Sequence, residues 1–349
     1  MFHYRSRAEE LINFSNHAFY GGKLKTVPNK RDLSKTPPIK RVFVENGNWR
    51  NRANHEEALE VVKLIKEILK TRKNNETIGV ITFNITQKDT IEDLLEVEML
   101  KNPEFNIQLT AEQNRTIDEE DISLFVKNIE NVQGDERDII IFSTGYAKDE
   151  RGRLASRFGS LSQDGGENRL NVAISRAKKQ VYVVTSFEPE ELNVETVKNR
   201  GPKLFKQYLQ YARYVSKGEL EQAKTFLSEI SKVTGVQNGD HFDSDFEIEV
   251  CDAVRDMGYT VLTQVGASGY KIDLVVYDDK TSRYVLGIEC DGATYHSSKS
   301  AKENDIYRQK FLESRGWKIF RIWSTDWWAD RKKILSDLDK VLKSELKLN

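Results

Sequence analysis

Three acidic side chains, Asp273, Glu289 and Asp291, lie on two strand-like segments of one short stretch, residues 269–296, which reads GYKIDLVVYDDKTSRYVLGIECDGATYH. Asp273 lies in the first of two strand-like segments, and Glu289 and Asp291 lie at the end of the second. Because side chains alternate between the two faces of a strand, Glu289 and Asp291 point the same way. If the two segments pair through the turn between them, Asp273 lies opposite the Glu289 end of its neighbour. The pattern predicts three carboxylates at one end of a sheet.

Carboxylates held so close together repel one another unless a cation neutralises them. Hard oxygen ligands suit Mg²⁺ or Mn²⁺. A divalent ion at such a site can lower the pKa of an attacking water and stabilise charge on a phosphoryl group. The alternative is that the acids are strand-end residues facing solvent, but two acids flanking a buried cysteine argue against it. The residues therefore favour a metal site suited to phosphodiester hydrolysis.

Histidine and cysteine add less to this interpretation. His296 follows the second segment, and a lone histidine after a strand is more often structural than catalytic. Cys251 and Cys290 each fall inside an expected core element and form no CxxC pair. We therefore expect two reduced, buried cysteines, with neither a disulfide framework nor a zinc site.

The elements that would position the acids begin near residue 244. Phe246, Val250 and Val254 recur at the spacing of one helical face, and Ser244 or Asp245 can cap that helix. The following pattern is expected to form strands at 259–264, 271–277, 284–290 and 318–323, with helices at about 301–315 and 329–347. The sum is a small α/β sandwich.

The first half of the chain alternates strand and helix signals. Residues 41–45 and 78–84 have strand patterns, and residues 55–69 and 86–100 are expected to be helices. Such alternation favours a parallel sheet with helices on both faces. A helical segment with an apolar face and then a polar run separate this half from the part that begins near residue 244.

Two charged stretches directly precede buried strands in this first half. VQGDERDIIIFS (132–143) places a polar turn before a strand, and RLNVAISRAKKQVYVVTS (169–186) places a basic helix before the strand 181–185. In a parallel sheet, such loops gather at one edge, where ligands usually bind. The alternative is that both are charged, solvated surface.

Composition limits the function classes. The 349 residues have a formal net charge of −1, so any nucleic-acid binding must come from local basic patches. No run of about 18 apolar residues occurs, and the first residues lack the layout of a signal peptide. We therefore expect a cytoplasmic protein without a membrane partner.

Residues 1–187 resemble the second RecA-like domain of superfamily 1 helicases, in the Upf1-like branch. HYRSR (3–7) resembles motif IV, VQGDERDIIIFS resembles motif V, and RLNVAISRAKK resembles motif VI, in the family's order. The resemblance implies that Arg5 and Arg176 reach the γ-phosphate of ATP bound between two RecA-like domains.

The same resemblance implies that Gln133, Gly134 and Glu136 form the motif V turn at that interface. The sequence departs from the family in one respect, because no GxxxxGK[ST] phosphate loop occurs in the 349 residues. We expect the first RecA-like domain to be supplied by a longer chain or by a separate one. Residues 188–243 are expected to be a helical appendage and linker.

Residues 244–349 resemble the Vsr-like branch of the PD-(D/E)XK nucleases, through SDFEIEV, QVGASGYKIDLVV, LGIECDGATYHSS and YRQKFLESRGWKIFRIWSTDWW. The resemblance implies that Asp273 and Glu289 are catalytic metal ligands, with Asp291 where the parent superfamily has lysine. That departure moves proton transfer toward His296 as general acid or base. The resemblance also implies that Glu247 holds the metal ion through a water molecule. The equal alternative is that Glu247 is a solvent-exposed acid at the start of a helix.

Several downstream residues are candidates for contact with nucleic acid. Phosphate contacts are expected from Arg308, Gln309 and Arg321, and base stacking from Tyr295. Tryptophans 323, 327 and 328 are better explained as core residues that close against the last helix.

Together these features predict an α/β chain in which a RecA-like parallel-sheet domain is followed by a small restriction-endonuclease-like domain. We expect a metal-dependent endonuclease that nicks DNA and is joined to one half of a helicase motor. The alternatives are a nucleic-acid-binding or assembly module with a cryptic nuclease, and a helicase-nuclease directed at RNA.

The missing phosphate loop gives a first prediction. The purified 349-residue chain should not hydrolyse ATP, since nothing in its sequence cradles the phosphates. Turnover at helicase-like rates in a phosphate-release assay, with and without single-stranded DNA, would contradict it.

Overall fold

A computed structural model describes residues 6, 8–21, 24, 37–118, 120–154, 158–233, 244–265, 272–281, 283–291, 309–310, 312–313 and 316–346. The chain divides into two compact units. The larger unit consists of Glu10–Phe19 and Pro38–Leu227, and the smaller unit contains all described residues from 244 onward.

The larger unit is built on a five-stranded sheet in which all neighbouring strands are parallel. The strand order is β1-β9-β8-β4-β7. Its inner strands read as continuous apolar runs because both faces of a parallel sheet are covered. The predicted parallel sheet is therefore confirmed. The strands are Ile39–Phe43 (β1), Ile78–Thr82 (β4), Phe125–Asn128 (β7), Arg137–Ser143 (β8) and Ala177–Thr185 (β9).

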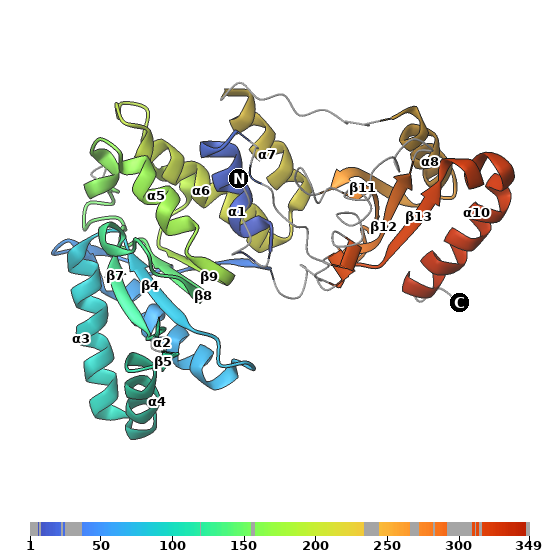
Figure 1. Cartoon of the computed structure of the whole chain (residues 1–349). Coiled ribbons are helices and arrows are strands. Elements are labelled where there is room, and N and C mark those ends of the chain that lie inside the picture. The colour runs from blue at the N-terminus through green and yellow to red at the C-terminus, as the bar shows by residue number, and fades with distance from the viewer. Residues whose placement is uncertain are drawn as a thin grey trace. The chain divides into compact units, whose positions relative to one another are not determined.

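Helices cover both faces of this sheet (Figure 1). Ile139 and Ile141 of β8 belong to the core beneath α2 and α3, whereas Phe142 packs edge-on against Tyr208 of α6, with ring centroids 6.1 Å apart. One strand thus alternates between two cores, as strand geometry requires. On the first face lie α2 (His55–Thr71) and α3 (Ile85–Lys101), with α4 (Pro103–Gln113) against α3; on the second lie α1 (Glu10–Phe19), α5 (Gly166–Ile174) and α6 (Arg200–Lys217).

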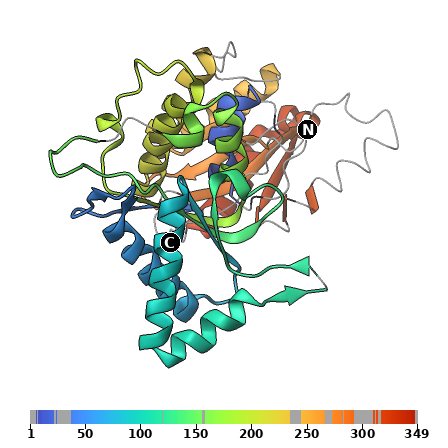
Figure 2. The same ribbon diagram turned by 90° about the vertical axis from the view of Figure 1, so that its left-hand side faces the viewer.

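Shorter elements complete the description. A hairpin of β5 and β6 projects from the end of α4 (Figure 2). The short elements are β2 (Trp49–Arg50), β3 (Ala53–Asn54), β5 (Thr116–Ile117), β6 (Glu120–Asp121), the 3-10 helices η1 (Ile129–Asn131), η2 (Gly159–Ser162) and η3 (Pro189–Glu191), and α7 (Leu220–Val233).

Three successive helices begin at an asparagine. The side chains of Asn54, Asn84 and Asn102 each accept from the backbone N–H three residues later, at 3.3, 2.8 and 3.1 Å. Each cap satisfies a donor that the first helical turn leaves without a partner. The sequence therefore fixes where α2, α3 and α4 start.

The basic helix predicted before β9 is shorter than expected. α5 ends at Ile174, and β9 begins at Ala177, which pairs with Arg137 of β8. Lys178 and Lys179 consequently lie in the strand, so their assignment to a helix was wrong. Both lysines face acids of β8 or of the turn before it, since Lys179 Nζ lies 3.2 Å from Asp138 Oδ1 and Lys178 Nζ lies 3.8 Å from Glu136 Oε2.

A fully buried carboxylate ties the carboxyl end of β8 to α2. Glu57 accepts hydrogen bonds from Ser143 Oγ at 2.9 Å, Gly145 N at 2.8 Å, Thr144 Oγ1 at 3.2 Å and Asn54 Nδ2 at 3.2 Å. Burial raises the pKa of Glu57 to about 8, although these hydrogen bonds oppose the shift. Near neutral pH the native state therefore favours the protonated form.

This shift gives a pH prediction. Between the unfolded pKa of 4.5 and the folded value of about 8, native Glu57 holds a proton that unfolding releases, so stability falls as pH rises. The stability of wild type relative to Glu57→Gln should fall between pH 5.5 and 8, by up to about 1.4 kcal/mol per pH unit. Urea unfolding at several pH values measures this difference, and a difference that stays constant or grows with pH would contradict the assignment.

Two glycines allow α5 and α6 to approach the backbone of η2. A Cβ at Gly201 would lie 2.1 Å from the carbonyl oxygen of Leu161, and one at Gly166 would lie 2.3 Å from the same atom. A carbonyl held in a turn cannot move aside as a flexible side chain can. The packing of α6 therefore requires glycine at this position.

Gly201→Ala should lower the free energy of unfolding by about 1–3 kcal/mol through overpacking, even though alanine is the better helix former. Lys203→Ala, at an exposed position of the same helix, is the matched control and should change it by less than about 0.5 kcal/mol. Urea unfolding measures both, and equal effects of the two substitutions would refute the packing argument.

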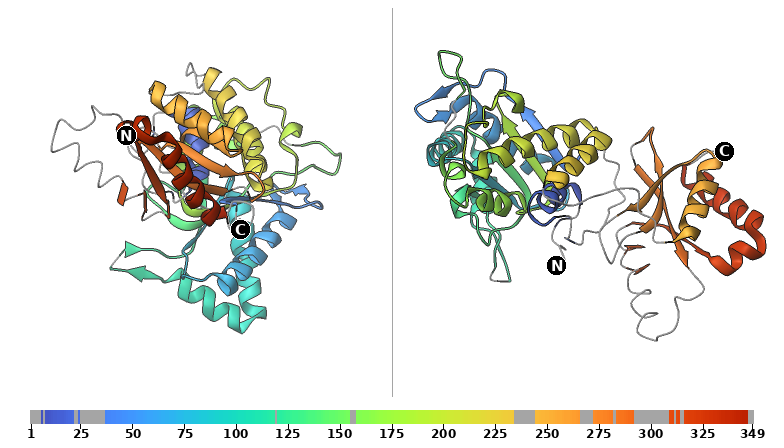
Figure 3. Two further views of the ribbon diagram at one scale, coloured as in Figure 1. Left: turned by 90° about the vertical axis from the view of Figure 1, so that its right-hand side faces the viewer. Right: turned by 90° about the horizontal axis from the view of Figure 1, so that it is seen from above.

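The smaller unit contains a four-stranded sheet in the order β10-β11-β12-β13. The first three strands are antiparallel in succession, and β13 runs parallel to β12. α8 and α10 lie on one face of the sheet (Figure 3). The four predicted strands are confirmed. The elements are α8 (Asp245–Asp256), β10 (Thr260–Val265), β11 (Ile272–Asp278), β12 (Arg283–Asp291), β13 (Ile319–Trp323) and α10 (Ser324–Leu346).

The last helix begins earlier than the sequence predicted. α10 starts directly after β13, and its backbone departs from helical geometry at Asp330, with φ −152° and ψ 75°. Trp327 is fully buried in the core shared with α8, as expected, whereas Trp328 is 66% exposed.

Among the described helices, none is long and apolar enough to cross a bilayer.

Candidate functional site

The ends of β11 and β12 bring the predicted acids together. Leu274 pairs with Ile288, and continuing this antiparallel register sets Asp273 opposite Glu289. The backbone N–H of Cys290 donates to Asp273 Oδ2 at 2.8 Å. The Asp273 carboxylate is thereby held against the end of β12.

Asp291 forms a bidentate ion pair with Arg321 of β13. Arg321 Nε donates to Asp291 Oδ2 and Arg321 Nη2 donates to Asp291 Oδ1, both at 2.8 Å. Glu289 and Asp291 are only 6% and 7% exposed, so neither is the solvent-facing acid of the alternative interpretation. The structure places Arg321 on a carboxylate rather than on open surface.

Glu247 is held in place by hydrogen bonds at both of its oxygens. Ser244, the N-cap of α8, accepts from Glu247 N at 3.3 Å and donates through Oγ to Glu247 Oε1 at 3.1 Å. Gln264 Nε2 donates to Oε2 at 2.8 Å. Glu247 is 5% exposed, which excludes a solvated acid at the helix start.

The four acids of the candidate site all influence the pKa of the Cys290 thiol. Burial first, and then the negative charges of Asp273, Glu247, Glu289 and Asp291, raise the pKa of Cys290 well above its ordinary value. The thiol therefore stays protonated near neutral pH and is not a nucleophile. Cys251 and Cys290 are both free, and Cys251 is buried as expected, whereas Cys290 is only half-buried.

Not every predicted residue of the site can be placed. His296, Tyr295 and Arg308 lie outside the described residues. Gln309 is described, and its Oε1 accepts from Arg321 Nη1 at 3.3 Å. Within the described parts of the chain, no group of three or more His, Cys, Asp and Glu side chains is close enough together to hold a metal ion.

The Asp291–Arg321 pair is the feature that sequence reasoning missed. Arg321 was predicted to contact phosphate, but it is also the partner of an acid in the candidate site. A signal was present, because Arg321 is the one charged residue in the strand Ile319–Trp323. A guanidinium in such a strand needs an acidic partner nearby.

A second cluster lies at the amino ends of β8 and β9. Arg137 N, at the start of β8, donates to the carbonyl of Arg176 at 3.2 Å, and Lys178 Nζ lies 3.8 Å from Glu136 Oε2. The turn before β8 and the segment before β9 therefore meet at one edge, as expected. It is, however, the amino edge of the strands, whereas ligands of open α/β sheets usually bind at the carboxyl edge.

Within this cluster the predicted residues differ in exposure. Gln133 and Gly134 are exposed, and Gly134 has φ 94°, which favours glycine. Arg176 is 8% exposed, and its guanidinium donates to the carbonyls of Val172 at 2.8 Å and Asp135 at 3.5 Å. Arg176 thus connects α5 to the turn that precedes β8. Arg5 lies outside the described residues.

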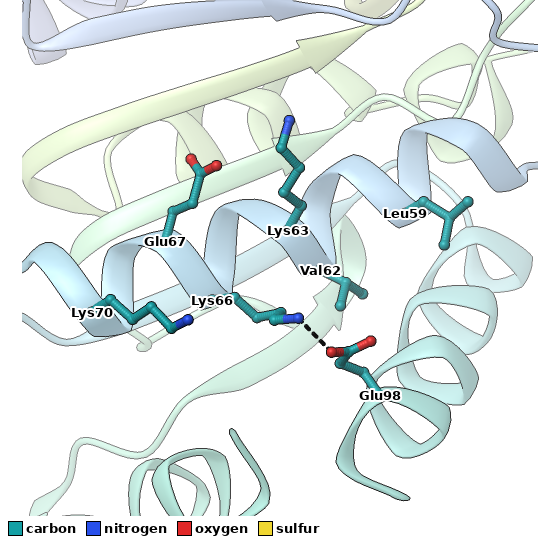
Figure 4. Close-up of a pocket in the computed structure, with 7 residues that line it drawn as sticks. All are labelled: Leu59, Val62, Lys63, Lys66, Glu67, Lys70 and Glu98. Atoms are coloured by element: carbon teal, nitrogen blue, oxygen red, sulfur yellow. Dashed lines mark hydrogen bonds and ion pairs between the residues drawn. The ribbon is translucent and has the colours of Figure 1, made fainter. Parts of the chain in front are cut away.

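A shallow groove runs over α2 of the larger unit (Figure 4). Two of its lysines form ion pairs: Lys66 reaches Glu98 of α3, and Lys63 Nζ lies 3.1 Å from Oε1 of Glu60, which does not line the groove. Its lining residues are Leu59, Val62, Lys63, Lys66, Glu67, Lys70 and Glu98.

Comparison with protein families identifies the larger unit. The model of the AAA_12 family, described as an AAA domain, matches residues 2–188. The chain belongs to this family. A second model, REase_MTES_1575, matches residues 246–342. An AAA_12 domain is therefore followed by a restriction-endonuclease-like domain, which confirms the predicted combination of a helicase-like and a nuclease-like part.

The chain is similar to two mycoplasma proteins. It is 32% identical over 348 residues to the uncharacterized ATP-dependent helicase MG140 homolog of Mycoplasma pneumoniae, and 34% identical over 345 residues to the uncharacterized ATP-dependent helicase MG140 of Mycoplasma genitalium. These matches cover 98% of this chain and 29% of each relative. The chain thus spans less than a third of their length.

Among solved structures, the C-terminal domain of a possible DNA helicase from Lactobacillus plantarum WCFS1 matches 52% of this chain and 87% of its own, with 16% identity and a TM-score of 0.29.

Proposed function

We propose that the REase_MTES_1575 part of the chain is a metal-dependent endonuclease that nicks DNA, and that the AAA_12 part is one half of an ATP-driven helicase motor. The observation that carries the nuclease proposal is the register of β11 and β12, which sets Asp273 opposite Glu289, with Asp291 two residues further along β12. The low exposure of Glu289 and Asp291 is unusual for acids that have no function together.

Asp273 and Glu289 are the residues that we expect to hold the metal. They offer carboxylate oxygens from two paired strands, the donor type that Mg²⁺ and Mn²⁺ prefer. When bound, the ion supplies a lowered pKa for a water ligand and positive charge for the phosphoryl group. Glu247 supports the site from α8, where Ser244 and Gln264 fix its carboxylate.

Asp291, His296 and the downstream polar residues complete the proposed site. The sequence predicts Asp291 as a further acid of the site, and His296 is the proposed general acid or base. Tyr295, Arg308, Gln309 and Arg321 are proposed to contact the nucleic acid.

For the AAA_12 part, we propose that the cluster at the amino edge of β8 and β9 faces ATP. Arg176 would approach the γ-phosphate, with Arg5 as a second guanidinium and Gln133, Gly134 and Glu136 as the adjoining turn. Because no phosphate loop occurs in the sequence, a further RecA-like domain must supply the cradle. Both mycoplasma relatives are named ATP-dependent helicases, which supports a motor function.

A second candidate function is a nucleic-acid-binding module whose nuclease is cryptic. The bidentate pair favours it, because Arg321 occupies both oxygens of Asp291 and adds positive charge where a cation would bind. In that case cleavage would require a partner that opens the pair. RNA remains the alternative substrate, and labelled DNA and RNA oligonucleotides of one sequence separate the two.

A plasmid-nicking assay tests the proposal. With Mg²⁺ or Mn²⁺, the wild-type chain should convert supercoiled to open-circular DNA, and a chelator should stop it. Asp273→Asn should reduce the rate at least about 100-fold, as loss of a metal ligand predicts. Asp252→Asn, at an exposed position of α8, is the control and should cut like wild type.

Two results would contradict this assignment. Unchanged cutting by Asp273→Asn would exclude its role. DNA cleavage that persists in the presence of a chelator would show that the reaction does not require a metal ion.

A further inference from the structure

Arg321 is fixed from several directions. Its Nε and Nη2 donate to the two oxygens of Asp291 at 2.8 Å, its Nη1 donates to Gln309 Oε1 at 3.3 Å, and its guanidinium carbon lies 5.4 Å from the centroid of the Trp323 ring. A guanidinium suits this place better than an ammonium, because its planar fork matches a carboxylate and its face stacks on an aromatic ring.

Strand pairing brings this arginine to the acids. In the parallel pairing of β12 and β13, Glu289 is opposite Arg321, and Asp291 is opposite Trp323. Side chains of paired residues lie on the same face, so Glu289, Asp291, Arg321 and Trp323 share one. The position of the cation is thus set by the sheet.

Binding a metal ion through Asp291 would cost free energy, because this carboxylate is already paired with Arg321. The side chains of Asp291 and Arg321 are 8% and 23% exposed. A cation that bound Asp291 would have to displace at least one of two short, charge-assisted hydrogen bonds and leave a partly buried guanidinium with a weakened partner. Asp273 Oδ2 accepts from the backbone N–H of Cys290, and displacing that neutral donor would leave no buried charge behind.

We infer that Asp291 is a positioning residue and not a metal ligand: it anchors Arg321, and the anchored guanidinium binds a phosphate oxygen of the nucleic acid beside the metal site of Asp273 and Glu289. This inference rests on the proposed function of the smaller unit. It divides the acids of the site into two that hold the cation and one that orients a positive side chain. It also gives Arg321 a role in substrate binding that depends on Asp291.

Mn²⁺ titration by calorimetry on the full chain, without nucleic acid, tests the first part. Removing Asp291 alone would alter the local charge, so the informative variant is Asp291→Asn/Arg321→Gln, which keeps the net charge of the site. It should bind Mn²⁺ within about threefold of wild type, while Asp273→Asn should lose at least about tenfold. If the double variant loses as much affinity as Asp273→Asn, Asp291 is a ligand and the inference is wrong.

Duplex binding tests the second part. The affinity of a short DNA duplex is measured in chelator over a range of NaCl concentrations. Arg321→Gln and the double variant should bind more weakly, and the slope of log affinity against log salt should fall by about one, as loss of one phosphate contact predicts. An unchanged slope would overturn the role of Arg321.

Arg321→Lys and the unfolding curves provide the controls. The lysine variant keeps the charge but not the fork, so its salt slope should match wild type. Circular dichroism melts of all variants exclude misfolding as the cause of any loss. A chain that binds Mn²⁺ in an Asp273-dependent way but cuts nothing would refute the proposed nuclease and leave the inference standing, whereas a wild type that binds no Mn²⁺ would overturn both.

Discussion

The parallel pairing of β12 with β13 is the constraint on which the candidate site depends. It places the one charged residue of an otherwise apolar strand next to the acidic end of its neighbour. Without that neighbour, Asp291 would be a buried carboxylate close to Asp273 and Glu289, an arrangement that repels itself. The ion pair with Arg321 removes one negative charge from the group.

The strands and their register follow from local sequence, and much of the site could therefore be predicted. Alternation along β12 put Glu289 and Asp291 on one face, and the short turn after β11 implied an antiparallel partner for Asp273. The Asp291–Arg321 pair could not be predicted in this way. The pair depends on which strand lies beside β12. Because 27 residues separate Asp291 from Ile319, the local sequence does not predict that β13 is this strand. Contacts across such a crossover are a property of topology rather than of periodicity.

The larger unit shows the same division between local and long-range information. Asparagine caps and apolar runs define its helices and strands, and these were largely predictable. The start of β9 was not, because Lys178 and Lys179 look like helix surface until the acidic residues of β8 and its preceding turn are placed beside them. Glu57 is a further case: its position predicts an ordinary acid at a helix start, yet three donors at the carboxyl end of β8 and the Asn54 side chain hold it in the core.

Both candidate sites contain an arginine that the protein has already immobilised. Carbonyls of Val172 and Asp135 hold Arg176, and the carboxylate of Asp291 holds Arg321. A guanidinium fixed in this way has lost most of its rotamer freedom before a phosphate arrives, so binding need not order it again. The two anchors differ in charge, however. The carbonyls that hold Arg176 are neutral, whereas Asp291 compensates much of the charge of Arg321. Arg321 should therefore contribute orientation more than long-range attraction, which fits a chain whose net charge of −1 provides little general attraction for nucleic acid.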